Sequence, residues 1–146
     1  SEQLSNLLRL AAPAQRSRSN MVELLRDHGA LCAALEERAP DGLCFGKVAL
    51  EQLTSVAPDL GALVELKERA KRALQQPASV RQREALTIIY HAAVAAAYGV
   101  HGAAISSRPL ESRAASYSDM AALLPPGPLH AIFVRALGRL EEQERS

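Results

Sequence analysis

Residues 79–102, SVRQREALTIIYHAAVAAAYGVHG, include the most apolar part of the chain. The segment opens on Ser79 and has Gln82 three residues later, which is the spacing of a helix capping box. Two glycines near its end favour helix termination there. After Ile88 nearly every residue is apolar or small, and a helix that is apolar on all sides is normally buried among other helices. The segment therefore predicts a buried, alanine-rich central helix over 79–101.

Helical patterns also flank this segment on both sides. Apolar residues recur at helical spacing in ranges that predict further helices at 4–11, 21–38, 43–56, 60–74, 109–124 and 128–140. Turn-forming residues separate several of them, as in the proline- and glycine-rich stretch 125–128, and Asp59 is placed to cap the helix that follows it. No strand pattern emerges. The fold class predicted is all-α, a compact orthogonal or up-down bundle of about six helices.

Length and composition fit one helical domain over residues 1–146. Within it we expect a short N-terminal helix and linker over 1–18 and a frayed tail over 141–146. Hydrophobic residues make up 48% of the chain but aromatic residues only 3%. The core must therefore be built from aliphatic side chains and alanine.

Charge and cysteine content restrict the classes of partner and compartment. The net charge of +1 argues against a nucleic-acid partner, because such domains are usually clearly basic. Two cysteines do not make a disulfide framework, and the sequence has no signal-peptide pattern and no apolar run long enough to predict a membrane span. We therefore expect a cytoplasmic protein without a membrane partner. Its alanine- and arginine-rich composition is typical of a bacterial protein.

The histidines of the central helix and the loop after it are the first candidates for binding. His91 lies within the apolar pattern, where a structural role competes with that of a partly buried base or ligand. His101 lies at the end of the helix, where a histidine interacts favourably with the C-terminal end of the helix dipole. It is followed by a polar loop with Ser106, Ser107 and Arg108, and such loops on a rigid scaffold often bind ligands. These five residues are our ligand-binding candidates, although their spacing indicates no particular reaction.

His28, Cys32 and Cys44 form the most metal-like set. His28 and Cys32 are four residues apart on one predicted helix face, and Cys44 follows a turn that could return it to that face. Structural zinc sites normally contain two cysteines two to four residues apart, and this chain has no such pair. Packing is therefore the favoured role of Cys32, and we predict no metal or other cofactor.

A basic face is predicted along residues 67–83. It comprises Lys67, Arg69, Lys71, Arg72, Arg81 and Arg83. Glutamates are interleaved with these cations, and the pairs Glu65–Arg69 and Glu68–Arg72 have the favourable i, i+4 order on a helix. No aromatic residue is placed for base stacking. A solvated helix face is thus favoured over a nucleic-acid site.

Three classes of function follow from these observations. No catalytic or phosphate-binding motif is present, which favours a non-enzymatic helical protein-interaction module: an adaptor, a regulator or a subunit that binds itself. The first alternative is a small-molecule or metal-binding protein, possessing a pocket near His91, His101, Ser106 and Arg108. The second is a nucleic-acid-associated regulator that uses the basic face.

Overall fold

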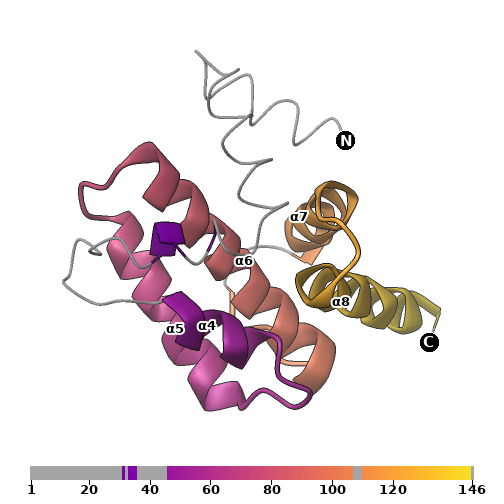
Figure 1. The fold of residues 1–146 in the computed structure, drawn as a ribbon. Coiled ribbons are helices and arrows are strands. Elements are labelled where there is room, and N and C mark those ends of the chain that lie inside the picture. Colours follow the sequence, from indigo (N-terminus) through magenta and orange to yellow (C-terminus); the bar gives the residue numbers. More distant parts are fainter. Residues whose placement is uncertain (1–30, 32, 36–45, 107–109, 146) are drawn as a thin grey trace.

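A computed structural model describes residues 31, 33–35, 46–106 and 110–145, and this part of the chain is all-α, without strands (Figure 1). The helices are α4 (Gly46–Leu53), α5 (Leu60–Leu74), α6 (Val80–His101), α7 (Leu110–Leu123) and α8 (Pro128–Arg145). The helical residues 31 and 33–35 contribute Leu31, Ala34 and Leu35 to the core. The predicted all-α bundle with a buried central helix is confirmed.

Helix α6 begins and ends where its capping residues predict. The Ser79 side chain accepts a hydrogen bond from the backbone N–H of Gln82 at 3.1 Å. Gly102 ends the helix in the left-handed conformation with φ of 67°, which glycine adopts without steric cost. Every residue from Ala92 to Gly99 is buried. This stretch is apolar or small on all sides, in agreement with its complete burial.

The other helices surround α6 in an order that differs from their order in the chain. Helix α5 packs along α6 on one side and α8 packs against it on another, while α7 lies mainly against α8 (Figure 1). Helix α4 makes smaller contacts with α5 and α6. A Cβ atom added to Gly99 would lie 3.2 Å from the backbone nitrogen of Ala136, so α6 and α8 approach closely because position 99 has no side chain.

Polar contacts fix the ends of α5. The Asp59 carboxylate accepts a hydrogen bond from the N–H of Ala62 at 3.0 Å, as the sequence predicts for a capping residue. At the other end, the Arg83 guanidinium of α6 donates to the carbonyl oxygens of Leu74 and Gln76 at 3.0 and 3.3 Å. These bonds use carbonyls that a helix C-terminus leaves without intrahelical partners.

Helices α7 and α8 contribute an aromatic pair to the core. Tyr117 and Phe133 are both buried and their ring centroids lie 6.3 Å apart. Asp119 is buried on α7, and burial raises the pKa of its carboxyl group. Helix α8 continues through residues 141–145, where the sequence predicts a frayed tail. Its last turns are tied to α6, since the buried Tyr98 hydroxyl donates to Gln143 Oε1 at 2.5 Å.

Candidate functional site: a groove between α6 and α8

An apolar groove of about 240 Å³ lies where the end of α6, the start of α8 and the α4–α5 connection meet. Its lining residues are Leu53, Thr54, Ser55, Val56, Pro58, Ala96, Gly99, Val100, Pro128, Ala131, Ile132 and Arg135. Among these described lining residues, three side chains are polar, and of the three only Arg135 is charged.

A second hollow, of about 380 Å³, continues the first along α8. It shares Gly99 and Arg135 with the first hollow and adds Gly138, Arg139 and Glu142. The α8 residues of the two hollows, from 128 to 142, recur every three or four positions and so share one helix face. We call the combined feature the α6–α8 groove. It follows α8 for about 21 Å at the rise of an α-helix.

Small residues create this groove. Ala96 and Gly99 supply a low wall on α6, and a Cβ atom added to Gly138 would meet nothing within 4 Å. Val56 stands at the rim with 93% of its surface exposed. An exposed valine beside an apolar groove enlarges the apolar surface that a partner could cover.

The α4–α5 connection that forms one wall is fastened to the end of α6. The His101 Nε2–H donates to the carbonyl oxygen of Pro58 at 2.7 Å. Pro58 itself is buried. His101 therefore positions the groove wall, in addition to its place at the helix C-terminus.

Positive charge is concentrated in the second half of the groove. Arg135 and Arg139 are one turn apart on α8, and the described part of the chain gives neither of them a hydrogen bond or an ion pair. Arg139 lies over Gly102, the cap of α6, where a cation favours the helix dipole. Arg135 is exposed and lines both hollows. The groove is thus apolar along the first half of the α8 face and carries Arg135 and Arg139 along the second, with Glu142 at its end.

The structure does not bring the predicted ligand-binding residues together. His91 is half-buried on α6, with its ring edge-on to Tyr90 at a centroid distance of 5.4 Å. His101 lies ten residues further, about 15 Å along the helix, and Ser106 follows in the next loop. None of these three lines either hollow of the α6–α8 groove. Ser107 and Arg108 lie outside the described residues, as do the metal candidates His28, Cys32 and Cys44.

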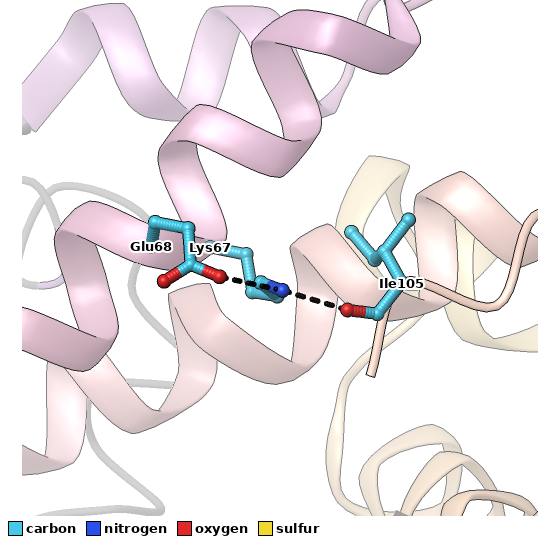
Figure 2. Close-up of polar contacts among 3 residues, drawn as sticks. All are labelled: Lys67, Glu68 and Ile105. Carbon is cyan, nitrogen blue, oxygen red and sulfur yellow. Dashed lines mark hydrogen bonds and ion pairs between the residues drawn. The ribbon is translucent and has the colours of Figure 1, made fainter. Parts of the chain in front are cut away.

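The loop after α6 is held by α5. The Lys67 side chain, only 12% exposed, donates to the carbonyl oxygen of Ile105 at 2.7 Å and pairs with the Glu68 carboxylate at 2.8 Å (Figure 2). The hydrogen bond from Lys67 lowers the pKa of Glu68. Sequence reasoning expects Glu68 to pair with Arg72, whereas its close contact is with the neighbouring lysine.

The predicted basic face is divided between structural and exposed cations. Lys67 and Arg83 bind backbone carbonyls, as described above, and Arg69 is partly buried. The remaining members, Lys71, Arg72 and Arg81, are exposed at the adjoining ends of α5 and α6. Lys67 and Arg83 are therefore engaged in holding the bundle together.

Sequence reasoning did not single out Val56, Arg135 or Arg139. The available signal is a pair of arginines at i, i+4 that continues a face of proline, alanine and isoleucine on the same helix. That signal becomes informative only when Gly99 of another helix is known to lie beside it.

Within the described ranges, no cluster of three or more histidine, cysteine or acidic residues could hold a metal ion. No helix in those ranges combines the length and apolarity that crossing a bilayer requires. No protein-family model matches the chain, and neither a curated protein nor a solved structure is detectably similar to it.

Proposed function

We propose that this protein is a helical protein-interaction module that binds an amphipathic helical segment of a partner in the α6–α8 groove. The observation that supports this most directly is the apolar groove of about 240 Å³ with the highly exposed Val56 at its rim. Binding an amphipathic helix through its apolar face is a recurrent way in which proteins use such grooves.

The chemistry of the lining supports binding in preference to catalysis. The Thr54 hydroxyl donates to the carbonyl oxygen of Leu50 at 2.8 Å, so it already serves the end of α4. A nucleophile requires an adjacent base, and the described residues that line the apolar half include neither a histidine nor an acid.

The alanine- and arginine-rich composition supports a bacterial origin, and a cytoplasmic location is part of the same proposal.

The test uses a designed amphipathic helical peptide of about 15 residues, with leucines on one face and neutral polar residues on the other. Adding it to isotope-labelled protein should shift the backbone NMR signals of Val56, Val100 and Ile132. Ala131 is exposed and lines the groove, so Ala131→Gln should fill the groove and abolish the shifts.

Val134→Ser provides the matched control, because Val134 is an exposed α8 residue that does not line the groove. It should leave peptide binding unchanged. Thermal unfolding of both variants confirms that they remain folded. Shifts that are spread over the whole surface, or that survive Ala131→Gln, would contradict the proposed function.

A further inference from the structure

We infer that the segment bound in the α6–α8 groove is acidic at one end: its apolar residues contact Val100 and Ile132, and its carboxylates bind Arg135 and Arg139. This inference rests on the proposed function and adds the charge and the direction of the partner. It follows from the order of residues along α8 and from the lack of hydrogen bonds and ion pairs at the two arginines within the described chain.

The spacing along α8 fits a single partner helix. Arg135 and Arg139 follow Ile132 by three and seven residues, which corresponds to about 4.5 and 10.5 Å along the helix axis. One turn of a partner helix rises about 5.4 Å. Carboxylates placed one and two turns beyond an apolar anchor would therefore lie opposite the two arginines.

The two guanidinium groups are suited to carboxylates. Within the described chain neither Arg135 nor Arg139 has a hydrogen bond or ion pair, so a carboxylate that binds them would displace no such contact there. Guanidinium groups are weakly hydrated and bind carboxylates in a bidentate manner. Glu142 ends the groove with the opposite charge and would repel an acid placed still further along. The order apolar, basic, acidic thus selects one direction of the partner.

The apolar half of the groove distinguishes a peptide from a nucleic acid. A nucleic-acid backbone needs a row of cations, and the first half of the groove presents Val56, Val100 and Ile132 in their place. Arg139 also lies at the C-terminus of α6, where its positive charge interacts favourably with the helix dipole even when no ligand is bound. Arg135 has no such second role in the described structure, so it is the diagnostic residue.

The experiment compares three helical peptides that share one leucine face. One carries glutamates at the two positions opposite the arginines, one carries lysines there, and the third is the neutral peptide described above. For the unaltered protein we expect the acidic peptide to bind about tenfold more tightly than the neutral one, with the gain reduced at high salt. The lysine peptide should bind more weakly than the neutral one.

Arg135→Glu should reverse the order of the acidic and lysine peptides, so that the lysine peptide binds more tightly than the acidic one. Arg72→Glu is the charge-matched control. Arg72 is exposed in the last turn of α5, and that end of the helix lies against the first turns of α6, away from the groove. This control should preserve the order seen with the unaltered protein.

The outcomes separate the two proposals. Equal affinities for the acidic and neutral peptides at the groove would overturn this inference and leave the proposed function standing. No groove-specific shift with any peptide would overturn both. Native mass spectrometry of the protein alone provides a further test, because a dimer that Ala131→Gln abolishes would identify a second copy as the occupant and overturn the acidic-partner inference.

Discussion

Glu84 is the residue whose ionisation opposes folding most clearly. Its Oε2 atom is buried without a hydrogen-bond partner in the described structure, and burial raises the pKa of the carboxyl group from 4.5 to about 7. Between these two values the folded protein binds more protons than the unfolded chain. Stability should therefore be greatest below pH 4.5 as far as this group is concerned, and should fall as the pH rises to 7.

Replacing this carboxyl group should make its effect measurable. At pH 7 and above, Glu84→Gln is expected to raise the free energy of unfolding by about 1 kcal/mol more than it does at pH 4.5. The expected gain is no larger because solvent screens a partly buried charge. Urea unfolding at both pH values measures the difference. Glu141→Gln, at an exposed carboxylate of α8, should show no comparable pH dependence. A stabilisation of Glu84→Gln that is equal at both pH values would contradict the interpretation.

Gly102 is required by its backbone conformation. Its φ of 67° costs other residues roughly 1 kcal/mol, and the Arg139 guanidinium occupies the space that a Cβ atom would need. Gly102→Ala should lower the free energy of unfolding by about 1–2 kcal/mol in chemical denaturation. Gly138→Ala is the control, because that helical position is open and alanine there should gain up to about 1 kcal/mol. Changes of the same sign at both positions would contradict this account.

At the scale of helices, the contact between α6 and α8 depends on Gly99. A larger side chain must push against the backbone of Ala136, so Gly99→Val should cost about 2–3 kcal/mol of stability and displace one wall of the groove. The midpoint of thermal unfolding and the affinity for the peptide should both be lowered. Ala122→Val, at an exposed position of α7, should cost only the helix-propensity difference of about 0.5 kcal/mol and leave peptide binding unchanged.

Helix boundaries were predictable where local chemistry sets them. Ser79 and Asp59 accept the capping bonds that their sequence positions indicate, and Gly102 ends α6 one residue beyond the predicted helix 79–101. Helix α7 spans Leu110–Leu123 where 109–124 was expected. These signals act over three or four residues of chain, so the sequence displays them directly.

The groove was not predictable by the same reasoning, because its walls come from segments distant in the chain. Arg135 reads as an ordinary exposed residue of an amphipathic helix until Gly99 and Val56 are placed beside it. Lys67 likewise reads as part of a basic face, yet its ammonium group binds the carbonyl of Ile105. Which carbonyl or hollow a long side chain reaches is decided by helix packing, which the local pattern does not specify.

For the whole molecule, the way in which the helices pack around α6 should make α6 the part most resistant to local unfolding. Helices α5 and α8 both cover α6. Within the described residues, α4 makes smaller contacts with α5 and α6 and leads into the exposed connection at Val56. Proteins open locally with free energies that follow such differences in burial, and ligand-binding elements belong to the less stable end. We therefore expect the groove wall from α6 and α8 to be rigid and the wall from α4 to open more readily.

Native-state hydrogen exchange tests this division. Amides of residues 92–99 should exchange only through global unfolding, with the full urea dependence, because every residue there is buried. The α4 amides that are hydrogen-bonded near Leu53 should exchange through a smaller opening with a weaker urea dependence. If the groove is the binding site, the bound peptide should slow exchange in α4 more than in α6, since binding stabilises the wall that otherwise opens. Coincident urea dependences for α4 and α6 would show instead that the groove is uniformly rigid and bound without adjustment.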